Sequence, residues 1–351
     1  MAAGDFTASA LPDILIKMEQ MFSGQRLTPE LNQPIDTIKA LAERQTVRFD
    51  AVDMLLDTAN CQGAKAVFLK SCDNDVATTI SGCEITGTET ESSYLTLANT
   101  MLYVKRFMVS EVDCADVFKG VDKIAYLMAK TMVDLENAIN EAAVAFLVAN
   151  SQDNDATLPD SWDNSDPDVI GIPANEMTPA ALAEIFYQGQ INNLYSPFLV
   201  SGRNFFTSKV LADFRSVGSD NVDKIFNSPL GDIVFDLKNI DTLTSLASTF
   251  AVDPSSYAFW PSNDFKSEAP ERWDDQYNTI VWRQRAPRLM YRDGTSLVPV
   301  YFDIMKQTKC TTASNRNLKE YHFQVIFRGG LQLGPQVCDT GDTGILHYKA
   351  V

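Results

Sequence analysis

The residues with which this sequence could most readily do chemistry are its carboxylates. Asp and Glu number 46, enough to include a glycosidase-type pair in which one carboxyl group donates a proton and the other accepts one or attacks. Asp274 and Asp275, beside Trp273, are the first pair to consider. Adjacent acidic residues in a loop are far more often solvated than catalytic, so a carbohydrate-active hydrolase stays open only as an alternative.

Histidine and glycine patterns give no support to an enzyme. His322 and His347 are the two histidines, and neither lies near the G-x-S-x-G pattern of a nucleophile elbow. His322 alternates with aromatic residues and is expected on the polar face of a strand, and His347 is expected in the tail. Gly82 and Gly87 have P-loop spacing, but Thr88 stands where the phosphate-binding lysine must be. No catalytic or cofactor-binding residue is predicted, and the protein is not expected to be an enzyme.

Cysteine and aspartate spacing does not predict a metal site. Zinc sites need ligand pairs about two to four residues apart, whereas Cys61, Cys72 and Cys83 are evenly and widely spaced. The Asp-rich loop at residues 151–175 suggests calcium, but Leu158 occupies the position where an EF-hand needs glycine. We therefore predict free thiols, a solvated loop, no metal and no cofactor.

Charge is unevenly distributed along the chain. The net charge is −17, from 29 Lys and Arg against 46 Asp and Glu. Residues 271–351 hold 11 basic and 8 acidic residues, a net of +3, whereas no basic residue lies between Lys130 and Arg203. So acidic a protein is not a general binder of nucleic acid or of anionic membranes, because such binding needs clustered cations. The basic C-terminal part is expected to face the acidic regions of a neighbouring copy.

One arginine cluster lies in this C-terminal part, next to Trp282 and Tyr291. Its members are Arg283, Arg285, Arg288 and Arg292. Phosphate contact is one interpretation, because cations beside aromatic side chains suit single-stranded nucleic acid. Pairing with carboxylates across a contact between subunits is the favoured interpretation. Lys65 and Lys70 are two further candidates for inter-subunit contacts.

Composition predicts a folded protein of the cytoplasm. Apolar residues make up 45% and charged residues 21% of the chain, which is ordinary for a protein with a core. The longest apolar run, residues 142–149, is far shorter than a bilayer span. The N-terminus carries Asp5 and no basic-then-apolar segment, so a signal peptide is not expected.

A long helix is the strongest structural signal. Ser110-x-x-Asp113 has the form of a capping box, and residues 110–149 contain no proline. Apolar residues then recur every three or four positions, which predicts one continuous apolar face. They are Val117, Val121, Ile124, Met128, Met132, Leu135, Ile139, Ala142 and Phe146. The helix is expected to end at Asn150, a residue that tolerates the left-handed cap.

The segments before this helix have too few apolar residues to bury cores of their own. Residues 1–45 contain Pro12, Pro29 and Pro34 and predict an extended arm with short helical turns. Residues 46–109 predict an extended β loop, because Thr and Ser dominate between two β-prone runs. An isolated hairpin is unstable until it packs on something, and that something could be another subunit.

Two more units are predicted after the helix and the acidic loop. Helices alternate with strands over residues 176–265, which predicts a small α/β domain with a mixed sheet and a first helix at Thr178-Pro179. Residues 266–351 predict antiparallel strands with a hairpin turn at Asp293-Gly294. The last clear strand is expected to end at Gly329-Gly330. Its apolar face consists of Tyr321, Phe323, Val325 and Phe327.

In this order of parts the chain resembles a tailed-bacteriophage major capsid protein, of the fold named for the Hong Kong ninety-seven phage. Residues 1–45 resemble the N-arm of that family, residues 46–109 its extended loop, and residues 110–150 its spine helix. Residues 176–265 resemble its axial domain, and residues 266–351 complete its peripheral domain. The resemblance covers nearly the whole chain and is architectural, so it carries over no functional residue. The fold it implies is α+β.

The resemblance also implies a structural role without a catalytic centre. Copies of the chain would assemble as hexamers and pentamers into an icosahedral shell around double-stranded DNA, without sequence-specific binding and without a membrane. A portal, decoration proteins and a separate scaffolding protein are the implied partners. The implied location is the virion capsid, assembled in the cytoplasm of a host bacterium. An encapsulin-type cage around a protein cargo has the same fold and is the alternative.

Overall fold

The computed structural model describes most of the chain. The described residues are 11–23, 31, 33–49, 65–68, 93–96, 99–110, 120–154, 156–194, 196–203, 205, 225–228, 231–244, 248–276, 278–313, 316–334 and 343–351. The helices are α1 Leu11–Ser23, α2 Asp36–Arg44, α4 Gly120–Ala149, the 3-10 helix η3 Ala174–Glu176, α5 Pro179–Ile191 and α8 Asn239–Leu243. The strands are β1 Arg48–Phe49, β2 Lys65–Phe68, β3 Ser93–Thr96, β4 Met101–Ser110, β5 Asp163–Asp166, β6 Val169–Ile172, β7 Phe198–Ser201, β8 Ile225–Ser228, β9 Gly231–Phe235, β10 Ser248–Val252, β11 Tyr257–Ser262, β12 Glu271–Asp274, β13 Thr279–Asp293, β14 Ser296–Ala313, β15 Arg316–Leu333 and β16 Ile345–Ala350.

The predicted long helix is present as α4, and the middle of its predicted apolar face is buried. The buried members of that face are Ile124, Met128, Met132, Leu135 and Ile139. The predicted start at Ser110 is wrong, because that residue ends β4 and pairs with Glu320 of β15. Residues 111–119, with Asp113 of the expected capping box, lie outside the described residues.

The C-terminal end of α4 lies where the sequence predicts it. Asn150 follows the last helical residue, and its side-chain Nδ2 donates to the carbonyl oxygen of Phe146 at 2.7 Å. The residue therefore satisfies a carbonyl of the last turn with its amide group.

A six-stranded antiparallel sheet packs on α4. Its order is β11-β15-β14-β13-β12, and β4 pairs with β15 along residues 320–329. The prediction that residues 101–109 belong to the extended loop is therefore wrong. The predicted turn between β13 and β14 is confirmed, and Gly294 there has a φ of +56°, which glycine adopts without strain.

Strand β15 does not end at Gly329-Gly330 as predicted but continues to Leu333. A Cβ atom at Gly329 would lie 2.3 Å from the carbonyl oxygen of Trp260 on the paired strand β11. The glycine is thus needed for the close approach of two strands. It does not mark a turn.

A seven-stranded mixed sheet forms the other end of the molecule, in the order β5-β6-β16-β10-β7-β9-β8. Helix α5 packs on one face and follows Thr178 as predicted. The other face contributes Val200, Phe250 and further residues to the core around α4. This sheet takes in residues 163–172 and 345–350, and β11 belongs to the large sheet instead, so its bounds differ from the predicted 176–265.

In the described part of the predicted arm, residues 11–23 and 36–44 form helices instead of short turns. Helices α1 and α2 both pack on α4, and Ile14, Met18, Ile38 and Leu41 are buried in the main core. Pro12 lies in the first turn of α1 and Pro34 precedes α2, positions where proline does not interrupt a helix. These two helices are therefore part of the subunit core.

A small three-stranded sheet, β1-β2-β3, lies at the base of the predicted extended loop. Strand β2 pairs antiparallel with β3, with Phe68 opposite Ser93. Residues 69–92, including Lys70, lie outside the described residues. The predicted two-stranded projection is thus described only at its base.

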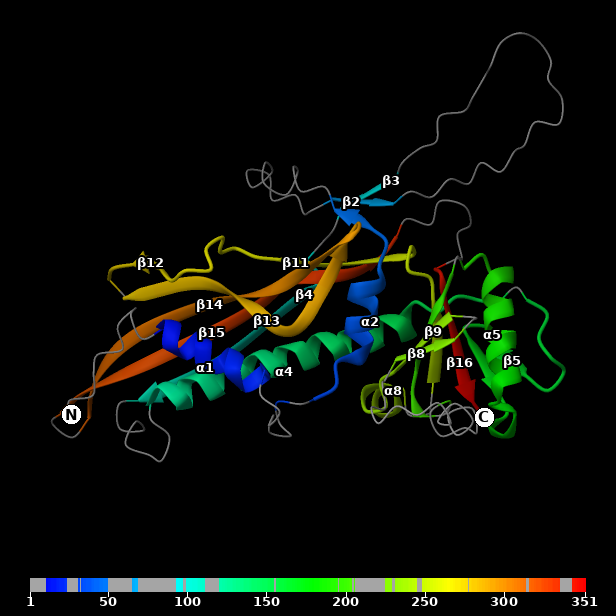
Figure 1. The fold of residues 1–351 in the computed structure, drawn as a ribbon, viewed down its shortest axis with the longest axis horizontal. Helices are drawn as coiled ribbons and strands as arrows, with labels where there is room; N and C mark the ends of the chain where they lie inside the picture. The colour runs from blue at the N-terminus through cyan, green and yellow to red at the C-terminus, as the bar shows by residue number, and fades with distance from the viewer. Residues whose placement is uncertain are drawn as a thin grey trace, which may run out of the picture.

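The molecule is elongated (Figure 1). Helix α4 runs along its length below the strands of the large sheet, and the seven-stranded sheet with α5 forms one end. Strands β2 and β3 lie on the side of the large sheet that faces away from α4. None of the described helices combines the length and the apolarity that crossing a bilayer requires.

Candidate functional site

Asp274 and Asp275 do not form a paired acid and base across a cleft. Oδ1 of Asp275 lies 2.5 Å from Nε of Arg272. Oδ1 of Asp274 accepts a hydrogen bond from the backbone N–H of Gln276 at 2.7 Å. Each carboxylate thus has a partner within three residues of itself, at the edge of the large sheet.

The two histidines lie in different sheets. His322 is half-buried on the outer face of β15, as predicted, with Nε2 3.2 Å from Oε2 of Glu320. His347 is not in a tail: it is buried in β16, its Nε2 is 2.9 Å from the Oγ of Ser248, and its ring stacks on Phe250 at 4.4 Å. His347 therefore belongs to the core of the seven-stranded sheet.

His347 should make the protein sensitive to acid. Burial lowers its pKa to about 4, and Lys349 adds to the lowering. Because the unfolded chain binds the proton near the ordinary pKa of about 6.5, this group's stabilisation is lost as the pH falls from there towards 4. We expect the free energy of unfolding to fall by about 2 kcal/mol through this group between about pH 7 and pH 4.5. Urea unfolding of the wild type and of His347→Gln at both pH values checks this, and an equal loss in the two proteins would contradict it.

The Asp-rich loop folds partly as the hairpin β5–β6 at the edge of the seven-stranded sheet. Nε1 of Trp162, which is buried, donates to Oε2 of Glu176 at 3.2 Å. Oδ1 of Asp163 accepts from the backbone N–H of Ser165 at 2.9 Å. Within the part of the chain that the structure describes, no group of three or more His, Cys, Asp or Glu is placed to hold a metal ion. The evenly spaced cysteines lie outside that part.

Arg288 points into the subunit. Its Nε lies 2.7 Å from Oε2 of Glu136, and its backbone N–H donates to Oε1 of the same carboxylate at 3.0 Å. Its Nη1 donates to the carbonyl oxygen of Gln33. Glu136 is fully buried in α4, and burial raises its pKa while Arg288 lowers it. This ion pair joins α4, β13 and the N-terminal segment.

The other three arginines of the predicted cluster do not form one surface. Nε of Arg292 donates to the carbonyl oxygen of Glu43 at 2.8 Å. Arg283 lies 3.3 Å from Glu268 and covers the ring of Tyr301 at 4.4 Å. Arg285 shares a face of β13 with Arg283, as predicted, and is exposed. The structure therefore leaves Arg285 as the member best placed to meet another molecule.

A buried polar network that was not predicted from the sequence lies between α4 and the seven-stranded sheet. Oδ2 of Asp236 accepts from Oγ1 of Thr37 at 2.8 Å and from Nδ2 of Asn140 at 2.9 Å. Oδ1 of Asn140 accepts from the backbone N–H of Ile38 at 2.8 Å. Glu136 and Asn140 are four residues apart on the buried side of α4. Two polar residues on an otherwise apolar helix face were the sequence signal from which this network could have been predicted.

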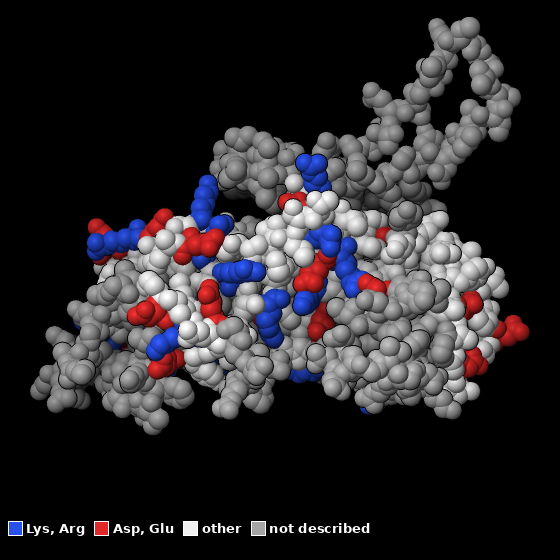
Figure 2. All heavy atoms as spheres, in the orientation of Figure 1, with Lys and Arg blue, Asp and Glu red and all other residues white. Residues whose placement is uncertain are grey.

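The surface reflects the uneven charge of the sequence. Figure 2 shows Lys and Arg side chains over the middle of one face, with Asp and Glu side chains among them. The end that carries α5 shows acidic side chains and no basic ones on this face. Opposite charges at different places on one subunit favour contact between unlike surfaces of neighbouring copies.

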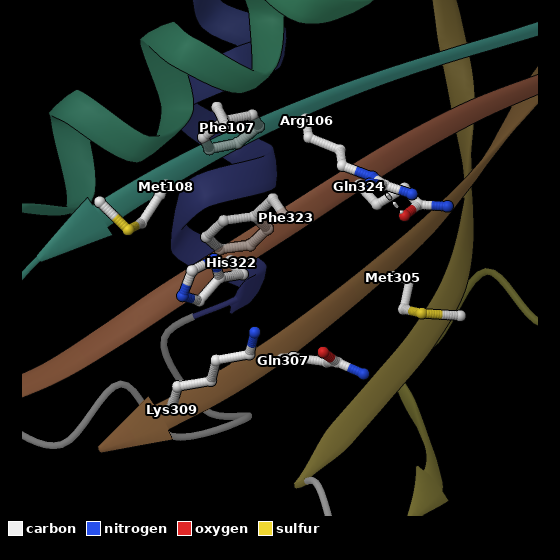
Figure 3. A pocket seen from close by; sticks show the side chains of 9 residues that line it. All are labelled: Arg106, Phe107, Met108, Met305, Gln307, Lys309, His322, Phe323 and Gln324. Atoms are coloured by element: carbon white, nitrogen blue, oxygen red, sulfur yellow. Dashed lines mark hydrogen bonds between the residues drawn. The ribbon is translucent and has the colours of Figure 1, made fainter. Parts of the chain in front are cut away.

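The outer face of β4, β15 and β14 carries a hollow of about 510 Å³ (Figure 3). Cross-strand pairing builds it in rows, with Arg106 opposite Gln324 and Gln324 opposite Met305. The next row places Met108 beside His322. Helix α4 packs on the opposite face of these strands, so this face is left uncovered within the described part of the subunit.

No protein-family model and no curated protein matches this chain. Among solved structures it is similar to a chain from Mycobacterium phage Adephagia, at 10% identity and a TM-score of 0.42, over 91% of each chain. It is also similar to a chain of the capsid of the cyanophage P-SCSP1u, at 12% identity and a TM-score of 0.41, over 88% of this chain and 87% of that one. A third is a chain of the capsid of an empty GTA particle, at 9% identity and a TM-score of 0.41, over 96% and 99%. Likeness at this level does not by itself assign a function.

Proposed function

We propose that this chain is the major capsid protein of a tailed bacteriophage. Copies of it assemble as hexamers and pentamers into an icosahedral shell that encloses double-stranded DNA. The observation that supports this best is the division of one elongated subunit into a covered and an uncovered side. Helix α4 covers one face of a long antiparallel sheet, and the other face exposes Leu102, Val104 and Met108. Apolar side chains gathered on one face mark a surface that another molecule covers.

The polar groups of the described residues serve the architecture of the subunit. Glu136 and Asp236, the most buried carboxylates of the main core, each hold several elements together through hydrogen bonds. Asp274 and Asp275 are engaged in their own turn. This use of charge suits a structural subunit, and we propose that the chain has no enzymatic activity.

The net charge of −17 suits a container for nucleic acid. A strongly basic inner wall would hold DNA by counterion release, whereas a container must leave its contents free to exit. We propose that the DNA is enclosed without sequence-specific binding.

Neighbouring copies of the same chain are the principal partners in this proposal. Arg285 is exposed, and we keep it, with Lys65 and Lys70, as a candidate inter-subunit contact. Arg288 and Arg292 are engaged within the subunit, so they are not proposed for this role. A separate scaffolding protein, a portal and decoration proteins are proposed as further partners, in the virion capsid and during assembly in the host cytoplasm.

Electron microscopy of the purified chain tests the proposal. We expect closed particles or ring-shaped capsomers, and a lower particle yield for Arg285→Glu, because charge reversal places like charges across a contact. Particles that enclose a protein cargo when isolated from their host would instead indicate a cage of the encapsulin type. A monodisperse 38.9 kDa monomer at every salt concentration and pH tried would overturn the proposal.

A further inference from the structure

All four tryptophans of the chain lie in the described part of the structure, and Trp273 is the one that is exposed. It is 59% exposed, whereas Trp162, Trp260 and Trp282 are buried. Burial of a large aromatic side chain stabilises a fold strongly, and Trp273 loses most of that contribution. The stability of the subunit therefore does not account for an indole at this position.

A bulge in strand β12 brings Trp273 to the surface. The pairing of β12 with β13 shifts in register between Arg272 and Asp274. Trp273 lies between them, and a bulge re-aims such a side chain relative to the regular pleat. The ring of Phe265 lies 5.1 Å from the indole, with the two planes at 85°. A ring at this angle covers at most one face of the indole, so Phe265 supports Trp273 and leaves a flat apolar face open.

The residues that flank Trp273 are polar and reach the solvent. Nε of Arg272 lies 2.5 Å from Oδ1 of Asp275, yet their side chains are 65% and 81% exposed. Glu271 and Gln276 are also exposed. The centre of a contact between proteins is depleted in charge, and its dominant aromatic residues lie among neutral contacts that exclude water. The charged surroundings of Trp273 do not suit such a contact.

A sugar ring has the chemistry that suits these surroundings. One face of a pyranose consists of C–H groups, which pack on the electron-rich face of an aromatic ring. Its rim consists of hydroxyl groups, which both donate and accept hydrogen bonds. Asp275 supplies acceptors for this rim, and Arg272 and Gln276 supply donors. Residues 271–276 carry three carboxylates and one guanidinium, a net charge of −2, which disfavours acidic sugars.

We propose that Trp273 and its polar neighbours form a binding site for a neutral sugar ring of an oligosaccharide. The site binds without hydrolysis, because Asp274 and Asp275 do not form the pair of carboxylates that glycoside hydrolysis requires. Figure 1 shows β12 at the end of the molecule away from α5. One stacked ring with a few hydrogen bonds supports a Kd of about 0.1–1 mM. In the shell proposed above, many such sites act together on one polysaccharide.

Saturation-transfer NMR on the full-length chain tests the site with three soluble hexasaccharides. Maltohexaose and chitohexaose are neutral, and hexagalacturonate is acidic. We expect binding of at least one neutral probe with a Kd of about 0.1–1 mM, and binding of the acidic probe weaker by about tenfold or more. Trp273→Ala should weaken the binding of the neutral probe by about tenfold or more, and Trp273→Phe by less, because phenylalanine keeps an aromatic face.

A matched control removes an aromatic ring of similar exposure at the other end of the molecule. Tyr187 on α5 is 54% exposed, and Tyr187→Ala should leave the Kd within about twofold of the wild type. No binding of either neutral probe at about 10 mM, or equal binding by the wild type and Trp273→Ala, would overturn the inference. A lower particle yield of Trp273→Ala without sugar binding by the wild type would also overturn it, and would assign Trp273 to a contact between copies.

Tryptophan fluorescence locates the bound sugar. Acrylamide quenches exposed indoles far more than buried ones, so quenching in the wild type reports mainly on Trp273. We expect the neutral probe to reduce this quenching at saturation, because the sugar ring covers the indole. Trp273→Phe should show little quenching with or without the probe. Unchanged quenching of the wild type at saturation would place the sugar elsewhere on the chain and overturn the inference.

Discussion

Replacing Arg288 with alanine is expected to lower the free energy of unfolding by about 3 kcal/mol near pH 7. Glu136 is fully buried, and the guanidinium of Arg288 supplies the opposite charge and a hydrogen bond from Nε to its carboxylate. The second donor, the backbone N–H of residue 288, remains in the alanine variant. Without the guanidinium, Glu136 must either remain a buried charge or bind a proton from water. Both alternatives cost free energy that the wild type does not lose.

The pH dependence of this loss distinguishes a buried charge from simple loss of packing. Burial already raises the pKa of Glu136 in the wild type, and removal of Arg288 should raise it further. If the carboxyl group is neutral in the folded state, it destabilises the protein least at a pH near the ordinary pKa of glutamate. At that pH the unfolded chain also binds the proton. The deficit of Arg288→Ala relative to the wild type should therefore shrink as the pH falls towards about 4.5.

A matched control lies three positions earlier on the same strand. Arg285 is exposed, and Arg285→Ala should change the free energy of unfolding by no more than about 0.5 kcal/mol. Urea unfolding in dilute solution, at concentrations too low for particles to form, measures both variants. Wild-type stability for Arg288→Ala, or a deficit that is the same at both pH values, would contradict the assignment.

The long periodic elements were predictable because burial on one side imposes a regular pattern on the sequence. Ile124, Met128 and Met132 recur at helical spacing along α4, and the alternation of Tyr321 and Phe323 sets the buried face of β15. The turn at Gly294 was predictable for a local reason, since Asp-Gly between two apolar runs favours a hairpin. Each of these features depends on residues that are close together in the sequence.

The parts that were wrongly predicted depend on contacts between distant residues. Strand β16 pairs with β10 and β6, which come more than 90 residues earlier in the chain, and nothing local to Ile345 or Tyr348 encodes those partners. Helix α1 has Pro12 in its first turn and α2 follows Pro34. Both helices are short, so their stability comes from packing on α4. The start of α4 was misplaced because Ser110 belongs to β4, where pairing with β15 outweighs its capping pattern.

The arginine cluster shows that proximity in sequence is a poor guide to a shared surface. Arg283 and Arg285 lie on the regular part of β13, but the pairing of β13 with β14 is interrupted between Arg285 and Met290. Such an irregularity breaks the alternation of side chains between the two faces of a strand, so the face of Arg288 does not follow from its spacing to Arg285. In the structure Arg288 lies in this interruption, where it meets the buried Glu136 of α4.

Shortening residues 71–92 to a four-residue Gly/Ser turn should abolish closed particles and leave the subunit folded. The base of the segment is secured by pairing of Phe68 with Ser93 in the β2–β3 hairpin, so the new turn connects two strands already held together. The bounds matter, because a wider deletion of residues 73–100 would remove β3 itself. Loop-closure entropy changes slowly with loop length, so the free energy of unfolding should change by no more than about 1 kcal/mol.

Shortening residues 71–92 should not change the packing of the subunit core, because the core residues lie in other parts of the chain. The apolar face of α4 is covered by α1, α2 and the two large sheets, and these contacts remain in the shortened chain. Circular dichroism and urea unfolding check that a cooperative fold persists, and electron microscopy checks the particles. A second variant replaces residues 71–92 by Gly and Ser at full length, and it should also fail to assemble, because the acidic and apolar side chains of this segment are gone. Normal particles from this second variant would show that the loss of particles in the shortened chain is due to length alone. A shortened chain that cannot fold would place residues 71–92 in the subunit core.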